Sequence, residues 1–297
     1  MANLKEVRSR IASVKNTQQI TSAMKMVSAS KLRKGQNALL KMRPYDEKLQ
    51  AIMQHISSDS SAQSVYAEER KKDNVLLVVV ASNRGLCGAF NTNVIDKAED
   101  VIANRFAEQK NNNRLYIYAV GKKVVQYFAQ SNYQVIGNDE DMIEKPTFEG
   151  VKSTAENLMQ KFVDGEYDHI EFVYNKFKNA ATQILTSEKF LPVVSEENNE
   201  DDDDKTSLSI ETEYIYEPDK EQIIKELVPK ILKLQFFKVF LDSHAAEHGA
   251  RMTAMHQATE NAKDLLRELR LSYNKARQAA ITNEIMEITS GANALRD

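Results

Sequence analysis

Two long stretches of the chain, one at each end, place apolar residues at alternating intervals of three and four positions. In the C-terminal stretch this spacing runs unbroken from Ile224 to Ala280, and only Lys238, His248 and Thr259 are plainly polar. A heptad pattern sustained over so many turns predicts a coiled-coil helix with a left-handed supercoil. The whole C-terminal helix would be on the order of 115 Å long, at about 1.5 Å per residue.

The N-terminal stretch predicts a second long helix. Its apolar stripe begins at Leu4, shifts register at Ile20, Met24 and Val27, and then resumes. The apolar seam of the C-terminal helix needs a cover, and an antiparallel pair with this helix would supply one. Such a pair would also bring the two ends of the chain near each other.

The pattern between these two stretches is different. Residues 74–82 form a continuous run rich in β-branched residues, typical of a strand buried on both faces of a parallel sheet. Strand and helix patterns then alternate, which predicts a mainly parallel sheet with helices on its faces. The expected strands are 74–82, 115–120, 133–136, 169–177, 182–192 and 208–216, and the expected helices are 93–109, 122–130 and 147–163.

Together these patterns predict an α/β fold combined with a long antiparallel two-helix coiled coil. The N-terminal helix would cover residues 1–57, an inserted Rossmann-like α/β domain residues 74–216, and the C-terminal helix residues 219–297. The acidic run 196–205 (EENNEDDDDK) repels itself and cannot bury apolar surface. We therefore expect it to be a disordered loop within the α/β domain.

The composition agrees with long elements and narrows the class of protein. The 297 residues include only 9 Gly and 5 Pro, so turns are few. A single cysteine, Cys87, excludes an internal disulfide and a multi-cysteine zinc site. No apolar run reaches about 18 residues, and charges begin at Lys5, so we expect neither a membrane span nor export.

Charge is spread unevenly along the N-terminal helix. Between residues 1 and 43, ten lysines and arginines accompany a single acid, Glu6. A solvated helix face usually mixes both signs, so this excess predicts an acidic partner surface or nucleic acid. The aromatic residues that stack on bases are missing from the same stretch, which counts against a nucleic-acid binder.

Two motifs suggest chemistry but are incomplete. The loop from Arg84 to Asn91 lies between a predicted strand and a helix, where a phosphate-binding loop would sit. It lacks a Gly-Lys-Ser/Thr ending, and the second strand ends without a ribose-binding acid, so a nucleotide-dependent enzyme is the less favoured alternative. His244, Glu247 and His248 match the H-x-x-E-H zinc pattern, but a projecting helix offers no cleft to exclude water, which disfavours zinc chemistry.

The last turns of the C-terminal helix depart from its seam. The old stripe would continue at Asn283 and Glu287, both polar, while a new apolar stripe begins at Ile281. We expect these turns to leave the helix pair and to present mixed contacts to another protein. The alternative is a frayed, exposed helix end. The residues concerned are Arg277, Gln278, Thr282 and Glu284, with Ile285, Ile288, Ala292 and Leu295 in the new stripe.

Several motifs resemble those of the gamma subunits of bacterial F-type ATP synthases. They are residues 21–27 (TSAMKMV), 84–88 (RGLCG), 250–255 (ARMTAM), 273–282 (YNKARQAAIT) and 290–292 (SGA). The resemblance covers essentially the whole chain and the order of its elements. The acidic run departs from the family pattern, and a single cysteine rules out a plant-type dithiol switch.

This resemblance implies a rotor shaft with no active site, metal or cofactor of its own. The coiled coil would run along the axis of a hexamer of alternating alpha and beta subunits, whose beta subunits hold the catalytic sites. The α/β domain would form the foot, with the epsilon subunit and the proton-driven membrane c-ring. The shaft would lie on the cytoplasmic face of the bacterial inner membrane, reached only through the c-ring, and would bind no nucleic acid.

The resemblance also implies individual contacts with the beta subunit. Met24 and Lys25 match positions that face an acidic beta-subunit segment, which agrees with the charge excess of the N-terminal helix. Arg251 lies in a second matching motif. Contacts with beta-subunit loops are implied for Arg277, Gln278, Thr282 and Glu284, and a bearing tip for Ile285, Ile288, Ala292 and Leu295.

Overall fold

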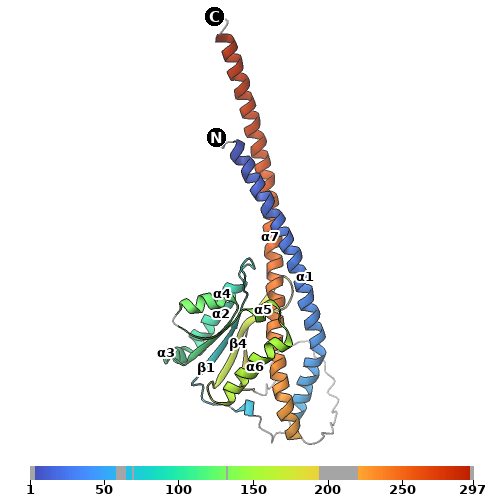
Figure 1. Ribbon diagram of the computed structural model, residues 1–297, viewed down its shortest axis with the longest axis vertical. Coiled ribbons are helices and arrows are strands. Elements are labelled where there is room, and N and C mark those ends of the chain that lie inside the picture. The colour runs from blue at the N-terminus through green and yellow to red at the C-terminus, as the bar shows by residue number, and fades with distance from the viewer. Residues whose placement is uncertain (1–3, 58–64, 69, 132, 194–219, 295–297) are drawn as a thin grey trace. The chain divides into compact units, whose positions relative to one another are not determined.

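The computed structural model describes most of the chain and confirms the predicted fold class. Two long helices, one from each end of the sequence, accompany an α/β domain that lies between them in the sequence (Figure 1). The acidic run 196–205 and the strand expected at 208–216 lie outside the described residues. The described residues are 4–57, 65–68, 70–131, 133–193 and 220–294.

The chain divides into two compact units. The smaller unit combines Met1–Ser30 with Arg251–Asp297, and the larger unit is Lys31–Ala250. Two helices contribute to both units: α1 (Leu4–Ser57) and α7 (Lys220–Ala294). The domain boundaries drawn from the sequence follow secondary structure instead, and they stay a prediction.

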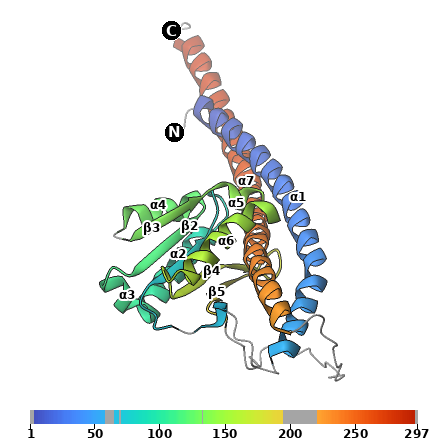
Figure 2. The same ribbon diagram turned by 60° about the horizontal axis from the view of Figure 1, so that its bottom comes forward.

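A five-stranded sheet organises the larger unit. Its strands are β1 (Val75–Val80), β2 (Leu115–Val120), β3 (Gln134–Asp139), β4 (His169–Phe177) and β5 (Gln183–Leu191). Their order across the sheet is β3-β2-β1-β4-β5 (Figure 2). All pairings are parallel except that of β5 with β4. The predicted strands in this part of the chain are confirmed, within two or three residues at their ends.

Helices cover both faces of the sheet (Figure 1). On one face lie α2 (Phe90–Arg105) and α4 (Lys122–Gln130), and on the other lie α6 (Phe148–Val163) and α7. The stretch 93–109, predicted as one helix, is two helices in the structure. The first ends at Arg105, and a second, short helix begins after Phe106. The remaining short elements are η1 (Val65–Ala67), α3 (Ala107–Asn111) and α5 (Asp141–Glu144).

Alternate residues of β1 belong to two separate cores. Val75, Leu77 and Val79 pack in the core beneath α2 and α4. The intervening residues pack in the core beneath α6 and α7. All six residues of the strand are fully buried, so the run of β-branched residues does mark a strand covered on both faces.

In the larger unit, α7 is packed against the sheet as well as against α1. The ring of Phe236 lies 5.2 Å from that of Phe172 and 5.6 Å from that of Phe190, so aromatic packing joins the helix to β4 and β5. This contact explains why the apolar residues of α7 here extend beyond the two positions per heptad that a coiled-coil seam uses. A helix buried on several sides needs apolar residues around most of its circumference.

Two contacts show that α1 and α7 are antiparallel in the larger unit. Gly35 lies against Ala245, and a Cβ on this glycine would come within 3.3 Å of the Ala245 Cβ. Further along, Lys238 Nζ lies 2.7 Å from Asp46 Oδ2. Residue numbers rise on one helix as they fall on the other. Gly35 therefore serves close helix packing, and Lys238, a polar interruption of the predicted seam, has a carboxylate partner.

The seam of α1 in the smaller unit corrects one prediction. Ile20 and Val27, expected to face α7 in a shifted register, are 60% and 59% exposed. The original register instead continues without a break through small and polar residues, and Thr21 and Ser28 are buried. The hydroxyls of Thr21 and Thr259 lie 2.9 Å apart across the pair. Hydrogen bonding thus replaces apolar volume at this level, which hydrophobic periodicity alone does not reveal.

A charged cluster lies where α2 meets β4, and it pairs a buried carboxylate, Glu171, with the half-exposed Arg105. Arg105 Nη1 and Nη2 donate to the two carboxylate oxygens of Glu171 at 2.8 and 2.9 Å. The Glu171 side chain is 1% exposed and also contacts His169 and Ser187. Burial raises the pKa of Glu171, but hydrogen bonds from His169 and Ser187 and the Arg105 charge outweigh burial, so the pKa is lowered overall.

We expect Arg105→Ala to lower the free energy of unfolding by about 2–3 kcal/mol, because it leaves a buried carboxylate without its bidentate partner. The matched control is Arg114→Ala, since Arg114 pairs at 3.4 Å with Asp73 and both side chains are about half exposed. That control should cost less than about 1 kcal/mol. Denaturant unfolding of the chain measures both, and equal losses would contradict the assignment.

Asp242 of α7 is a second buried carboxyl, near the end of β4. Burial raises its pKa to about 6, although the charges of Lys238 and Lys176 and a hydrogen bond from the Phe177 N–H oppose the rise. The folded chain therefore binds this proton more tightly than the unfolded chain, whose aspartate pKa is about 3.9. Stability from this group is present at low pH and is lost as the pH rises from about 4 to about 6.

Asp242→Asn should remove this pH dependence, because the amide can accept the same N–H but has no proton to lose. The stability of the variant relative to the natural chain should increase by about 2–3 kcal/mol between pH 4 and pH 7. Denaturant unfolding at both pH values gives the comparison. A stability difference that is the same at both values would show that Asp242 does not titrate in this range.

Candidate protein-binding surface

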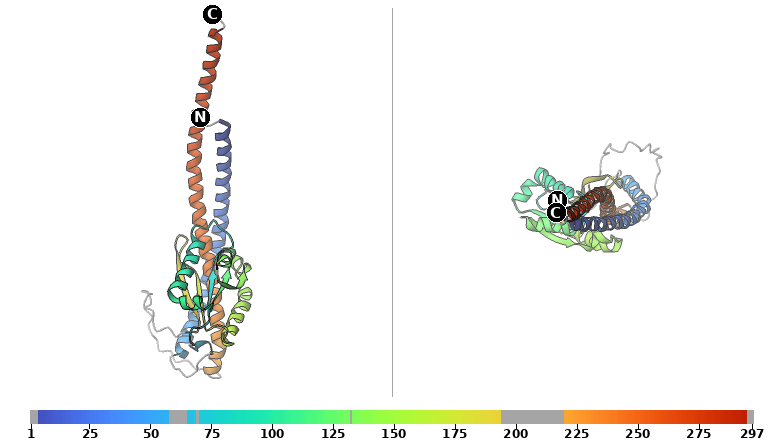
Figure 3. Two further views of the ribbon diagram at one scale, coloured as in Figure 1. Left: turned by 90° about the vertical axis from the view of Figure 1, so that its left-hand side faces the viewer. Right: turned by 90° about the horizontal axis from the view of Figure 1, so that it is seen from above.

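In the smaller unit, α1 and α7 form an antiparallel pair that has a defined end (Figure 3). The pair is held by Thr21 against Thr259 and, one turn before the end, by Arg8 against Tyr273. Between these contacts the seam of α7 is buried at Ala262 and Leu266, at 8% and 5% exposure. The part of the predicted seam between Thr259 and Tyr273 is thus confirmed as the paired face of the helix.

Beyond Tyr273 and Ala276, the rest of α7 is exposed in the described part of the smaller unit. Figure 3 shows the last turns of α7 continuing past the start of α1. Four large apolar side chains lie on these turns: Ile281 is 47% exposed, Ile285 58%, Met286 57% and Ile288 69%. A helix of this length is marginal in water on its own, and clustered exposed apolar residues mark a surface that another protein covers.

The residues predicted to contact a partner lie on these same turns. The polar ones are all exposed, and Thr282 donates to the carbonyl of Gln278, four residues earlier, at 3.0 Å. The apolar ones form a stripe, of which Leu295 lies outside the described residues. The exposed members of the set are Arg277, Gln278, Thr282, Glu284, Ile285, Ile288 and Ala292.

The second predicted contact, on α1, lies among exposed apolar residues. Met24 is half-buried, and Lys25 Nζ lies 3.2 Å from His256 Nδ1 on α7. Ile20, Met26 and Val27 are each at least 59% exposed around it. These three were not predicted as surface residues. Their displacement from the unbroken register of three and four was the signal that could have identified them.

Arg251, the remaining predicted contact, is only 7% exposed. It is the first residue of α7 that belongs to the smaller unit. Its role as a contact stays a prediction, and the geometry places it apart from the exposed set on the last turns.

The loop after β1, expected to be a candidate nucleotide site, is held together by its own side chains. The Ser82 hydroxyl lies 2.8 Å from Asn91 Oδ1 and 2.7 Å from the Arg84 carbonyl. Cys87 and Phe90 pack against Ala246 of α7. Leu86 has a φ of 63°, in the left-handed region, and its side chain is 65% exposed. These contacts favour a structural turn that joins the sheet to the helix.

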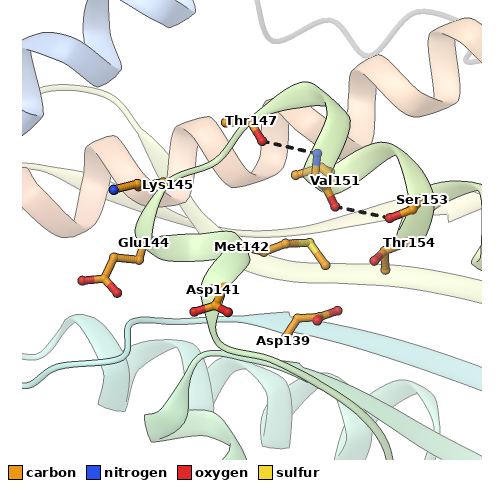
Figure 4. Close-up of a pocket in the computed structure, with 10 residues that line it drawn as sticks. Asp139, Asp141, Met142, Glu144, Lys145, Thr147, Val151, Ser153 and Thr154 are labelled. Carbon is orange, nitrogen blue, oxygen red and sulfur yellow. Dashed lines mark hydrogen bonds between the residues drawn. The ribbon is translucent and has the colours of Figure 1, made fainter.

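A pocket of about 650 Å³ lies beside the end of β3, between α5 and the first turns of α6 (Figure 4). Asp139, Asp141 and Glu144 bring three carboxylates to it against one lysine, Lys145, and Thr147 caps α6 at its edge. This negative charge disfavours a nucleotide phosphate. Residues 84–91 contribute nothing to the lining, so the pocket does not support the nucleotide-dependent alternative.

The H-x-x-E-H motif is buried in α7. The rings of His244 and His248 lie 4.5 Å apart, with an edge-to-face arrangement. His244, Glu247 and His248 are all less than 9% exposed. Across the residues that the structure describes, no group of three or more His, Cys, Asp or Glu side chains is arranged to hold a metal ion.

Among the described residues, two exposed surfaces are candidates for protein contact. One surface comprises the last turns of α7, and the other comprises the exposed apolar and basic residues of α1 around Met24. None of the described helices combines the length and apolar character that a membrane span requires.

Buried and exposed positions of α7 should respond differently to truncation. Leu266→Ala should lower the free energy of unfolding by about 2–3 kcal/mol, because it empties part of the paired seam. Ile285→Ala should change it by less than about 0.5 kcal/mol, since Ile285 is 58% exposed. Denaturant unfolding of both variants tests the paired and unpaired assignment. A large loss for Ile285→Ala would mean that its turn packs within the chain.

Comparison with known proteins gives a consistent result over the full length. The family model described as ATP synthase matches residues 3–295. The chain is 53% identical over 300 residues to the ATP synthase gamma chain of Christiangramia forsetii, with 99% of each chain covered. It is 50% identical over 299 residues to that of Flavobacterium psychrophilum, with both chains covered completely.

Solved structures share the fold at lower identity. A chain of the Euglena gracilis mitochondrial ATP synthase structure of OSCP, F1 and c-ring is similar with a TM-score of 0.68 and 23% identity, covering 98% of this chain and 94% of that one. A chain of the Tetrahymena thermophila mitochondrial central stalk and c-ring has a TM-score of 0.55 and 21% identity, covering 80% and 99%. With the family model matched almost end to end and curated relatives at about half identity, the chain belongs to the ATP synthase gamma chain family.

Proposed function

We propose that this chain is the central rotor shaft of an F-type ATP synthase and couples c-ring rotation to ATP synthesis or hydrolysis. The observation that carries the proposal is the full-length family match together with an antiparallel helix pair whose longer member ends in exposed apolar turns. The chain is a non-catalytic subunit, and the chemistry of the complex takes place in the beta subunits. Of the two similar solved structures, one is of mitochondrial OSCP, F1 and c-ring, and the other is of a mitochondrial central stalk and c-ring.

The physical logic of a shaft is that it offers different contacts in different directions. The sides of a helix pair are unequal: here one side of α1 exposes Ile20, Met26 and Val27, while the seam side is buried. A partner arranged around such a shaft meets a different surface at each orientation. Those differential contacts bias the partner between its states, and the coupling acts in both directions for binding equilibria.

The contacts proposed for the beta subunit fall into two groups. Met24 and Lys25 would face an acidic beta-subunit segment, supported by the ten-to-one excess of basic residues in residues 1–43. The exposed polar side chains on the last turns of α7 would grip beta-subunit loops, and the apolar stripe would turn in a bearing formed by the hexamer. Arg251 is retained as a buried contact candidate.

The α/β domain is proposed to form the foot of the rotor, with the epsilon subunit and the c-ring as neighbours. The chain is a peripheral part of a membrane complex. We place it on the cytoplasmic face of the inner membrane, which is supported by the bacterial origin of its relatives. The membrane would be met only through the c-ring, and no nucleic acid is involved.

Met24→Lys should impair coupling more than stability. It adds a positive charge to a half-buried position on an already basic helix that is expected to meet an acidic neighbour. ATP synthesis should fall relative to ATP hydrolysis, while the unfolding midpoint of the chain changes little. Ala12→Lys, on the same helix at an exposed position, is the control. Normal coupled synthesis by Met24→Lys would count against this placement.

Co-expression with the alpha and beta subunits of the same organism tests the function directly. We expect a stable complex with ATPase activity that depends on this chain. Replacing Ile281, Ile285 and Ile288 together by Ser should weaken the complex but leave the fold of the free chain unchanged, since all three are exposed. Failure of the natural chain to join its alpha and beta subunits would overturn the proposal.

A further inference from the structure

A lysine of α7 lies next to two carboxyl groups in the larger unit, one on each long helix. Lys238 Nζ donates to Asp46 Oδ2 of α1 at 2.7 Å, and the Asp46 side chain is 13% exposed. Asp242 follows Lys238 by one helical turn and is 5% exposed. Residues four apart share one side of a helix, so the second carboxyl group lies within the field of the same ammonium group.

Asp242 also faces the end of β4. The Phe177 N–H donates to its carboxyl group, and Lys176 acts on it through its charge. Lys176 is exposed, so solvent screens this charge, whereas Lys238 is 34% exposed and has the larger effect on Asp242. Lys238 is therefore the cation that an ionised Asp242 attracts most.

The carboxylate of Glu188 on β5, which also acts on Asp242, is engaged by other donors. It accepts from the Tyr174 hydroxyl at Oε2, at 2.8 Å, and from Gln235 Nε2 at Oε1, at 2.7 Å. The Tyr174 phenol stays neutral, because burial and the charges of Glu188 and Asp242 raise its pKa. Neither group can neutralise an ionised Asp242, so the charge of Asp242 acts chiefly on Lys238.

The protonation state of Asp242 decides how Lys238 is shared. Burial raises the pKa of Asp242 to about 6, so this group passes from neutral to ionised between about pH 5 and pH 7. In the structure the ammonium group of Lys238 pairs with Asp46 and forms no ion pair with Asp242. A neutral Asp242 leaves that pair undisturbed. An ionised Asp242 attracts the same ammonium group toward its own helix, which weakens the pair that joins α7 to α1.

We propose that Asp46, Lys238 and Asp242 form a pH-sensitive switch in the larger unit: a protonated Asp242 leaves Lys238 to tie α1 to α7 through Asp46, and an ionised Asp242 draws Lys238 away from α1. The switch is a property of the chain alone. Its use in a rotating shaft rests on the proposed function, because a looser tie between the two helices makes the shaft less stiff. The two parts are tested separately.

Glu47 provides the matched control for Asp46. It is the next residue of α1, and its side chain is exposed. Glu47→Gln removes the same charge from the same turn as Asp46→Asn but leaves the pair between Lys238 and Asp46 in place. An effect of net charge alone should therefore appear equally in both variants.

The first experiment titrates Asp242 in the free chain. Aspartate labelled with carbon-13 at the carboxyl carbon, with the Asp242 signal identified by its loss in Asp242→Asn, gives the pKa of this group by NMR. Asp46→Asn should lower this pKa by about half a unit to one unit, because it releases Lys238 to Asp242. Glu47→Gln should leave the pKa of Asp242 unchanged. Equal shifts in Asp46→Asn and Glu47→Gln would overturn the switch.

A double variant separates action through Lys238 from direct repulsion between the two carboxylates. Lys238→Gln should raise the pKa of Asp242, because it removes the main favourable charge. Adding Asp46→Asn to Lys238→Gln should then change nothing further, since the group that connects the two carboxyls is gone. A fall in the pKa of Asp242 as large as that in the natural background would show that Asp46 acts directly, and the switch would not exist.

Denaturant unfolding gives the same linkage from the other side. Asp46→Asn should lower the folding equilibrium constant about three- to tenfold more at pH 5 than at pH 7.5, because the tie is complete only when Asp242 is protonated. In the Asp242→Asn background the loss should be the same at both pH values. A loss in the natural background that does not change with pH would contradict the proposal.

The use of the switch is tested in the complex with alpha and beta subunits. Asp242→Asn keeps the helices tied at every pH, so the variant and natural complexes should hydrolyse ATP at nearly equal rates at pH 5.5. Their rates should differ at pH 7.5, where the natural Asp242 is ionised. Equal rates at both pH values would overturn the role of the switch in the shaft. The titration of the free chain decides on the switch itself, whatever the complex shows.

Discussion

Burial of the apolar seam of α7 against α1 is the interaction on which the rest of this structure depends. Neither helix is stable alone over such a length in water, because helix propensity is too weak to hold it. In the larger unit the pair is closed by Gly35 against Ala245, and in the smaller unit by Thr21 against Thr259. The two ends of the sequence must therefore fold together, and the α/β domain is carried between them.

This constraint also explains where function can lie. The sheet is covered on both faces, and the loop after β1 packs against α7 through Cys87 and Phe90. Two of the surfaces that expose large apolar side chains are the outer side of α1 and the turns of α7 beyond Tyr273. We propose both as protein-contact surfaces, because they are apolar with charged residues interspersed. A subunit that transmits force rather than performing chemistry needs surfaces of this kind.

Periodicity in the sequence was sufficient for the helices and for most of the sheet, because long apolar patterns are set by burial. It failed where polar groups do the packing. The seam of α1 passes through Thr21 and Ser28, both buried, and a hydrogen bond joins Thr21 to Thr259 across the pair. The Arg8–Tyr273 contact joins residues 265 positions apart, and no local pattern announces it. The shift of the apolar stripe at Ile281 was enough to predict a contact surface on the last turns of α7, whereas the contacts of Met24, Lys25 and Arg251 came from resemblance to a family.

The central claim is that this chain turns within its partners. It is tested most directly by single-molecule observation of rotation in the complex with alpha and beta subunits. Glu108, exposed on α3, can be replaced by Cys to attach a bead, while the natural Cys87 is buried. The account predicts stepwise rotation in one direction that requires ATP. A complex that hydrolyses ATP while the bead on this chain stays fixed would contradict it.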